Sequence, residues 1–262
     1  TNTVFSKTAT VSDPNPSSGI FSTIWSQDSG VGTITFSNPS SPSTNISADI
    51  DGVYVVRLTV TDSAGNTNFA TFSLTWDTTN PNVSAGANQV KNGVFTQNGN
   101  AFDSLSGVAF TNWSLVLGPG IITFGSPNTL TTTVSASLDG TYVIQLTVTD
   151  NAGNLSTQTF TLVWDTLSPL VSAGSNVITN AQFTQVGLVS DAAPSSGILS
   201  TVWAQISGSA GLTFGTPNAL STTISASLDG VYVIRLTVTD NGGNLNFSDF
   251  TLTWDSTPPG GA

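Results

Sequence analysis

The chain has 262 residues, of which 38% are hydrophobic and only 7% are charged, and its net charge is -11 with four basic residues. Nucleic acids and anionic membranes are bound through clusters of Lys and Arg, so this balance argues against both partners. Cys, His and Met are absent, which excludes disulfides, Ser-His-Asp triads and Cys-His pairs. No apolar run is long enough to span a membrane.

An internal repeat divides the chain into three similar units. Trp25, Trp113 and Trp203 are spaced by 88 and 90 residues, and a unit of this length suits one small β-sandwich domain. The same two intervals separate two further sets, which are Asp51, Asp139 and Asp229, and Trp76, Trp164 and Trp254. The units are joined by segments of the type Asp-x-x-x-Pro. We therefore predict three domains with the boundaries 1–81, 82–169 and 170–262.

The first unit starts part-way through the repeat. Phe5 precedes Trp25 by 20 residues, as Phe183 precedes Trp203, so Thr1 corresponds to a position just before the second strand. The Val-Ser-Ala-Gly strand that opens the other two units has no counterpart in this sequence. An unpaired sheet edge accepts strands from elsewhere, and few charges oppose such pairing here. We therefore predict that this edge is completed by an upstream repeat of a longer array, or else by a strand of an identical subunit in a filament.

The central unit shows the strand pattern most clearly. Its apolar residues recur at every second position, which predicts antiparallel strands with one buried face. Roughly seven strands per unit predict an immunoglobulin-like sandwich. The strand residues, in chain order, are Val83 to Asn88, then Phe95, then Trp113, Leu115 and Leu117, then Ile122 and Phe124, then Val134, Ala136 and Leu138, then Tyr142, Ile144, Leu146 and Val148, and finally Phe160, Leu162 and Trp164.

Two aromatic positions support this fold. A lone Trp, such as Trp113, lies on an early strand, where immunoglobulin-like cores place their central aromatic side chain. Tyr142 follows Asp139-Gly140 just inside the penultimate strand, and Tyr54 and Tyr232 repeat this arrangement. A Tyr in this place predicts a tyrosine corner, in which the hydroxyl donates a hydrogen bond to the backbone upstream.

Several motifs occur together in the units: Val-Ser-Ala-Gly-x-Asn at the first strand, the mid-domain Trp, Gly118-Pro-Gly120, and Gly-x-Tyr-x-x-x-Leu-Thr-Val-Thr-Asp-x-x-Gly-Asn. In these motifs the chain resembles the PKD superfamily of immunoglobulin-like repeats, which are common in bacterial surface proteins. The resemblance implies an all-β chain of three tandem immunoglobulin-like (PKD-like) β-sandwich domains forming an elongated rod. It also implies an extracellular or cell-surface location, a bacterial origin, and a role as a spacer, adhesive stalk or accessory module.

We expect no catalytic activity from this residue inventory. A pair of Asp residues can hydrolyse a glycoside, but here the Asp residues recur in turns and linkers at the same place in every unit, where a structural role is expected. The six Trp residues continue alternating strand patterns, so we assign them to the core and not to a sugar-stacking platform.

The predicted function is therefore that of an extracellular structural or adhesive tandem-repeat protein, such as a surface stalk, an adhesin segment or a filament subunit. Its partners would be neighbouring repeats or identical subunits. The alternative is a carbohydrate-binding accessory module of a secreted enzyme, with a glycan ligand. Solvent-exposed aromatic residues in line on one sheet face would indicate this alternative.

The joints between units contain the candidate ligand site. In a rod of immunoglobulin-like domains, the end of each last strand meets loops of the next domain. This brings Asp and Asn side chains together, and their oxygen atoms suit Ca²⁺. The alternative is that these side chains satisfy their own turns, which turn preference alone favours. The candidates are Asp77, Asp103, Asp150 and Asn154 at the first joint, and Asp165, Asp191, Asp240 and Asn244 at the second.

Overall fold

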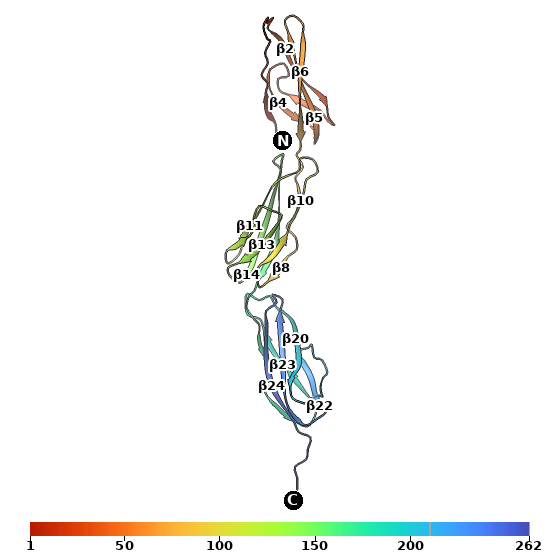
Figure 1. Cartoon of the computed structure of the whole chain (residues 1–262), viewed down its shortest axis with the longest axis vertical. Helices are drawn as coiled ribbons and strands as arrows, with labels where there is room; N and C mark the ends of the chain where they lie inside the picture. The colour runs from red at the N-terminus through yellow and green to blue at the C-terminus, as the bar shows by residue number, and fades with distance from the viewer. Residues whose placement is uncertain (210, 262) are drawn as a thin grey trace.

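The computed structural model describes residues 1–209 and 211–261, and Ala262, the end of the third predicted domain, lies outside this part of the chain. The described residues form 24 β-strands and no helix, so none of their elements is a helix long and apolar enough to cross a bilayer. Three β-sandwich units follow one another along a rod, as predicted (Figure 1). The N-terminus lies beside the first joint, and the C-terminus projects from the far end of the third unit.

The three units repeat the same succession of strands. The first unit contains β1 (Phe5–Thr8), β2 (Ile20–Ser29), β3 (Ile34–Phe36), β4 (Ser43–Ala48), β5 (Gly52–Asp62) and β6 (Thr67–Trp76). The central unit contains β7 (Asn82–Ser84), β8 (Gln89–Lys91), β9 (Phe95–Asn98), β10 (Asn100–Phe102), β11 (Val108–Leu117), β12 (Ile122–Phe124), β13 (Thr131–Ala136), β14 (Gly140–Asp150) and β15 (Leu155–Trp164). The third unit contains β16 (Leu170–Ser172), β17 (Val177–Thr179), β18 (Phe183–Val186), β19 (Leu188–Ser190), β20 (Ile198–Ser207), β21 (Leu212–Phe214), β22 (Ser221–Ala226), β23 (Gly230–Asp240) and β24 (Leu245–Trp254). The boundaries 81/82 and 169/170 stay predictions.

Each unit is built from two main sheets. In the central unit these sheets have the strand orders β11-β14-β15-β8 and β12-β13-β9, and β10 and β7 form a separate short pair. The third unit repeats this with β20-β23-β24-β17, β18-β22-β21 and β16-β19. β8 and β17 add in parallel to the last long strand, whereas the other neighbours are antiparallel. The first unit has β2-β5-β6 and β1-β4-β3, and its described residues contain no counterpart of β7 or β8.

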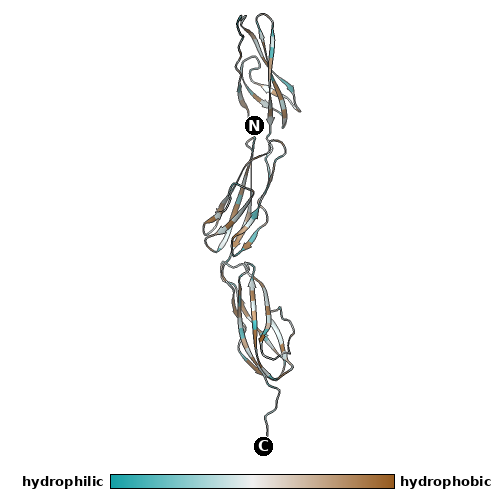
Figure 2. Ribbon diagram, viewed as in Figure 1, coloured by the Kyte–Doolittle hydropathy of each residue, from teal (hydrophilic) through white to brown (hydrophobic). Residues whose placement is uncertain are grey.

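Strand β14 shows how the sequence pattern builds the core. Tyr142, Ile144, Leu146 and Val148 are all fully buried, while the residues between them are partly exposed, as the predicted alternation requires. Burying side chains of this size contributes about 1.5–3 kcal/mol each. The alternation is visible as bands of hydrophobic and hydrophilic residues along the strands (Figure 2). All six Trp residues are buried, which confirms their assignment to the core.

The predicted tyrosine corners are present in all three units. The hydroxyls of Tyr54, Tyr142 and Tyr232 donate to backbone carbonyls four residues upstream, at 2.5, 2.6 and 2.7 Å. The ring of Tyr142 lies directly against the Gly118-Pro-Gly120 segment. A Cβ at Gly118 would lie 2.1 Å from Cδ1 of this ring, so only glycine permits the contact.

Three details of the central unit differ from the sequence prediction. Leu117 is 68% exposed, because an irregularity between Leu115 and Leu117 shifts the register of β11 against β14, and Leu115, which still pairs with Ile144, is 37% exposed. Leu138 is 56% exposed, because β13 has already ended and this residue lies in the turn of the tyrosine corner. The first strand is also shorter than predicted: β7 ends at Ser84, and the chain then crosses to the other sheet as β8.

Candidate site at the joints between units

The first joint gathers carboxylates from two units. Asp77 follows the last strand of the first unit, Asp103 follows β10, and Asp150 ends β14. One carboxylate oxygen from each of the three lies within 4.8 Å of the others. Asn154, in the turn after β14, donates to the backbone carbonyl of Asp77 at 2.9 Å and to Oδ2 of Asp150 at 2.7 Å. The structure thus brings together the four residues that the sequence analysis placed at this joint.

The second joint repeats the first with the corresponding residues. Asp165, Asp191 and Asp240 place one carboxylate oxygen each within 4.8 Å of the others. Asn244 donates to the carbonyl of Asp165 at 2.8 Å and to Oδ2 of Asp240 at 2.9 Å. The two joints therefore have the same construction.

Docking of consecutive units is what buries these groups. Asp77 and Asp165 are fully buried, whereas Asp255, at the same place after the last strand of the third unit, is exposed. Asn154 is 7% exposed, whereas Asn66, its counterpart at the end of the first unit that meets no other described unit, is exposed. At the two ends that meet no other described unit, the same residue types thus face solvent.

Each joint contains a bridging asparagine that the sequence analysis missed. Nδ2 of Asn2 donates to Oδ1 of Asn154 at 2.9 Å, and Nδ2 of Asn92 donates to Oδ1 of Asn244 at 3.0 Å. The carboxamides of Asn154 and Asn244 are therefore bonded on both the oxygen and the nitrogen. Aligning the repeats would have found this pair, since Asn2 and Asn92 occupy the same position relative to Phe5 and Phe95.

The aspartates that mark the repeat also hold the linkers. Asp51 accepts hydrogen bonds from the backbone and hydroxyl of Thr78, at 2.8 and 2.9 Å. Asp139 does the same with Thr166, both at 3.0 Å. The sequence analysis noted these aspartates only as repeat markers, and the structure shows that they fix the second residue of each linker.

The joint aspartates also satisfy their own turns. Oδ1 of Asp103 accepts the backbone N–H groups of Leu105, Ser106 and Gly107 at 3.1, 2.8 and 2.7 Å. Burial raises the pKa of Asp150, but hydrogen bonds from Asn154 and the turn backbone outweigh it and hold this pKa below its ordinary value. Asp150 is therefore an ionised carboxylate in a buried setting at neutral pH.

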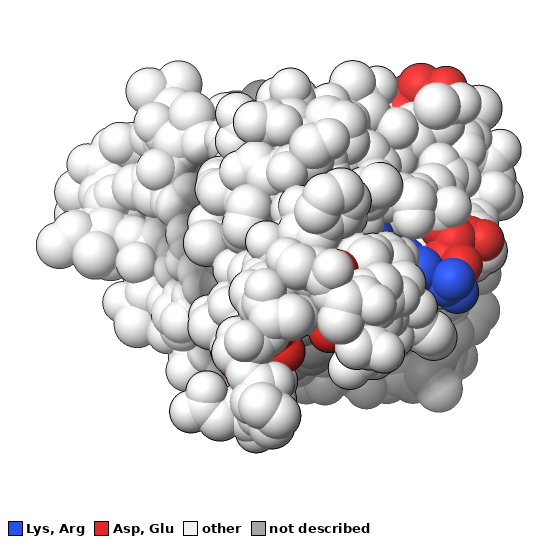
Figure 3. All heavy atoms as spheres, turned by 90° about the horizontal axis from the view of Figure 1, so that it is seen from above, with Lys and Arg blue, Asp and Glu red and all other residues white. Residues whose placement is uncertain are grey.

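Basic side chains are directed elsewhere. Within the described residues the salt bridges are Arg57–Asp28 and Arg235–Asp249, both at 2.7 Å, and neither involves a joint aspartate. Lys7, Arg57, Lys91 and Arg235 each lie over a Phe ring. A view along the rod shows how sparse charged side chains are on this face (Figure 3).

At the second joint, Oδ1 of Asp191 is buried and makes no hydrogen bond to any described residue. Buried charges are ordinarily paired or coordinate a metal.

A family model described as "K319L-like, PKD domain" matches residues 2–75, 85–163 and 173–253, which is most of the chain. The chain belongs to this PKD domain family. It is 30% identical over 204 residues to the mouse Dyslexia-associated protein KIAA0319-like protein, covering 73% of the chain and 19% of the relative. It is 28% identical over 218 residues to the human Dyslexia-associated protein KIAA0319, covering 77% of the chain and 20% of the relative. The chain thus spans about a fifth of the length of these relatives.

Solved structures that are similar to the chain include a PKD domain and a protocadherin. The PKD domain from KIAA 1837 protein is 25% identical, with a TM-score of 0.27, covering 35% of this chain and 92% of that domain. The protocadherin gammaB7 EC3-6 cis-dimer structure is 13% identical, with a TM-score of 0.37, covering 96% of this chain and 76% of that one. The family model confirms the PKD resemblance, but the bacterial origin expected from the sequence is not supported, since these curated relatives are mammalian.

Proposed function

We propose that the chain is a non-catalytic structural and adhesive rod of an extracellular protein, in which the PKD units act as stiff spacers. The observation that carries this proposal is the pair of joints, which repeat the same hydrogen bonds with the same residue types. When every joint in an array has one geometry, successive units extend in a regular direction. Such an array holds whatever lies at its ends at a fixed separation.

The glycan-binding alternative has little support in the exposed aromatic residues. The six Trp side chains are buried and have no free face for a sugar ring. Among the exposed Phe residues, Phe69 and Phe247 lie under the guanidinium groups of Arg57 and Arg235, with the guanidinium carbon 4.3 and 3.5 Å from the ring centroid. The matched family is a PKD domain and not a catalytic family.

The proposal includes Ca²⁺ at both joints. Ca²⁺ binds carboxylate and carbonyl oxygens at about 2.3–2.6 Å, so oxygens on opposite sides of the ion are about 5 Å apart. The oxygens of each aspartate trio lie within 4.8 Å of one another, which fits one shared cation. A cation would also supply the positive charge that these buried carboxylates do not receive from any described basic side chain. Because Asp77 and Asp165 belong to the preceding unit, the cation would link the units directly.

Calorimetric titration of the intact chain with Ca²⁺ tests this part of the proposal. We expect one ion per joint, with an affinity in the range of extracellular modules, roughly 0.1–1 mM. Asp240→Asn should remove binding at the second joint only. Asp62→Asn is the matched control, because Asp62 is the counterpart of Asp240 at an end of the first unit that docks on no described unit, and it should leave both sites intact. No heat and no change in melting temperature at millimolar Ca²⁺ would dispose of the calcium sites.

Small-angle X-ray scattering tests the rod itself. Asp240→Asn without Ca²⁺, and the wild type with and without it, should all scatter as extended particles, because the hydrogen bonds of Asn154 and Asn244 tie the joints in each case. Ca²⁺ should narrow the distribution of overall lengths fully in the wild type and in Asp62→Asn, and less in Asp240→Asn, which keeps only the site at the first joint. A compact particle, or a broad distribution typical of freely hinged domains in every sample, would contradict the spacer function.

A further inference from the structure

The bridging residue of the second joint is followed by a glycine. Asn92 lies in the bend after β8 of the central unit, and its Nδ2 donates to Oδ1 of Asn244 in the third unit at 3.0 Å. Both Asn92 and Gly93 are exposed to solvent. The side-chain amide of an asparagine can be attacked by the backbone nitrogen of the next residue. Glycine leaves this attack unhindered, because it has no Cβ and adopts many backbone conformations.

The corresponding asparagines of the other two units are followed by residues that carry a side chain. Such a side chain hinders the approach of the backbone nitrogen to the amide. A Cβ at Gly93 would meet no atom within 4 Å, so the fold itself does not require a glycine at this place. The two counterparts of the pair are Asn2 before Thr3 and Asn180 before Ala181.

The attacking nitrogen is also held differently in the three units. In the first and third units its N–H donates to the hydroxyl of a threonine, which fixes the nitrogen in place. The central unit has Lys91 at the position of this threonine, and a lysine side chain offers no acceptor. Among the described residues, the N–H of Gly93 has no hydrogen-bond acceptor. The two threonine pairs are Thr3 to Oγ1 of Thr1 at 3.4 Å and Ala181 to Oγ1 of Thr179 at 3.1 Å.

The other Asn-Gly pairs in the sequence are restrained. At Asn98-Gly99, the N–H of the glycine donates to the carbonyl of Leu130 at 2.9 Å. At Asn241-Gly242, the N–H of the glycine donates to Oγ of Ser196 at 3.0 Å, and Nδ2 of the asparagine donates to the carbonyl of the same serine at 2.9 Å. Attack at either pair therefore requires local opening of the backbone first. Neither pair has the unbonded nitrogen that is found at the second joint.

We propose that Asn92 is a site of spontaneous deamidation. The nitrogen of Gly93 loses its proton and forms a bond to Cγ of Asn92, while the bond from Cγ to Nδ2 breaks and ammonia leaves. The product of this step is a cyclic succinimide. Water then opens the ring at either carbonyl and leaves an aspartate or an isoaspartate. The reaction is a substitution followed by a hydrolysis, so water is the co-reactant and no electrons are transferred.

Deamidation removes the bridge of the second joint. A carboxylate has only acceptors, and Oδ1 of Asn244 is an acceptor too, so the hydrogen bond between Asn92 and Asn244 is lost. The new negative charge also lies beside a joint that already contains three aspartates. The first joint keeps its bridge, because Asn2 is followed by a threonine. The second joint therefore loosens with time, a consequence that rests on the proposed spacer function, whereas the reaction itself does not.

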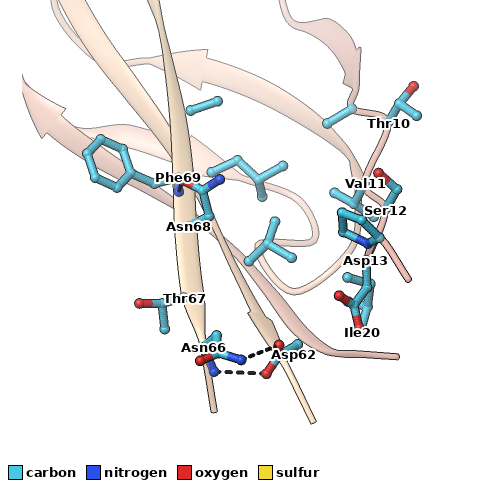
Figure 4. A pocket seen from close by; sticks show the side chains of 15 residues that line it. Thr10, Val11, Ser12, Asp13, Ile20, Asp62, Asn66, Thr67, Asn68 and Phe69 are labelled. Atoms are coloured by element: carbon cyan, nitrogen blue, oxygen red, sulfur yellow. Dashed lines mark hydrogen bonds between the residues drawn. The ribbon is translucent and has the colours of Figure 1, made fainter. Parts of the chain in front are cut away.

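The turn that contains Asn244 does not need the bridge. Asn66 is the counterpart of Asn244 at the end of the first unit that meets no other described unit. Its backbone N–H and its Nδ2 donate to Oδ1 and Oδ2 of Asp62, both at 2.8 Å (Figure 4). Asn244 makes the same two bonds to Asp240, at 2.8 and 2.9 Å. Loss of the bridge therefore acts on the joint and leaves this turn in place.

Incubation of the intact chain in heavy-oxygen water at neutral pH tests the reaction. Ring opening places heavy oxygen in the product, so peptide mapping by mass spectrometry distinguishes it from deamidation during digestion. We expect label at Asn92 roughly tenfold or more faster than at Asn98 or Asn241, since these must open first. A synthetic peptide of residues 88–96 gives the unrestrained rate, and the bridge should slow Asn92 in the chain by at most about tenfold. Absence of label at Asn92 after the peptide has reacted completely would overturn the proposal.

Two variants at neighbouring positions test the structural reason. Gly93→Ala places a Cβ in open space, and Lys91→Thr supplies the hydroxyl acceptor that the other two units have. Both should fold as the wild type does and label Asn92 more slowly. Labelling of both variants at the wild-type rate would show that neither the glycine nor the unbonded nitrogen governs the site.

Asn92→Asp carries the charge of the product in every molecule and tests the consequence for the joint. It should broaden the scattering-derived length distribution. Asn180→Asp is the matched control, because Asn180 lies at the end of the third unit that meets no other described unit, and it should change nothing. Equal distributions for Asn92→Asp and the wild type would overturn the loosening of the joint. Label at Asn92 in a chain that scatters as a compact particle would support the deamidation site and refute the spacer function.

Discussion

Replacing Trp113 with Ala would show whether each unit folds around its own tryptophan. Trp113 is 2% exposed and packs edge-to-face on Phe160, with ring centroids 5.8 Å apart. Its Nε1 donates to the carbonyl of Thr129 at 2.9 Å. The substitution therefore removes a large apolar contact and a hydrogen bond, and it leaves a cavity between the two sheets.

The expected loss is large relative to the stability of one unit. Truncating a buried Trp to Ala costs about 3–5 kcal/mol. A domain of this size has a total stability of roughly 4–13 kcal/mol, at about 0.05–0.15 kcal/mol per residue. At about 4–8 °C per kcal/mol, the melting transition of the central unit should fall by roughly 12 °C or more.

Differential scanning calorimetry of the intact chain resolves this effect by unit. Trp113→Ala should lower one transition, and Trp203→Ala, the matched variant, should lower a different one. Trp113→Phe keeps an aromatic ring in the core but loses the indole donor, so its cost should be smaller, at about 1–3 kcal/mol. Wild-type melting of Trp113→Ala would refute the role of this side chain as the centre of the unit.

Three further predictions concern single groups. Tyr232→Phe removes the hydroxyl that donates to Leu228, and it should lower the free energy of unfolding of the third unit by about 1–3 kcal/mol in a urea titration. The pKa of Asp150 lies below its unfolded value of about 3.9, so the stability it contributes is complete above that pH and is lost as the pH falls through the folded pKa. Melting temperatures of wild type and Asp150→Asn should therefore converge on acidification below about pH 4. Asn244→Ala should widen the scattering-derived length distribution, because it removes the hydrogen bond to the carbonyl of Asp165, whereas Asn66→Ala, which loses only a bond within its own turn, should not.

Different results would count against each of these. An unchanged urea midpoint for Tyr232→Phe would mean that the tyrosine corner contributes nothing to stability. A constant melting difference between wild type and Asp150→Asn from neutral to acid pH would remove the carboxylate from the acid response. Equal length distributions for Asn244→Ala and the wild type would show that the joint is held by other contacts.

Periodicity was sufficient to predict the fold wherever a strand is regular. The run from Tyr142 to Val148 alternates without interruption, and its apolar members are all buried. The same reasoning failed at Leu117, because a register shift moves a residue to the other face without altering the sequence pattern. It also failed at Leu138, since the alternation continues past the last residue of the strand into the turn.

The site could be placed in part because rod geometry is predictable. In an end-to-end array, the residue after the last strand must approach the loops of the next unit, which identifies Asp77 and Asp150 as neighbours. The bridging residues Asn2 and Asn92 were missed, because polar loop residues carry no periodic signal. Their contacts span 152 residues of sequence and exist only because one unit docks on the next.

The linkers of this chain are also parts of the units that follow them. Within a dozen residues, the segment from Asp77 to Asn88 contributes to the joint, pairs as β7 with β10, places Ala85 in the core and accepts a hydrogen bond from Thr161 of β15. Only residues 78–81 lie between the joint residue Asp77 and β7, so little free chain separates the first two units, and residues 166–169 have the same place between Asp165 and β16. Stiffness of the rod and stability of each unit are coupled through this one segment. In such an array, the stability of each unit depends on the unit that precedes it, through the segment that joins the two.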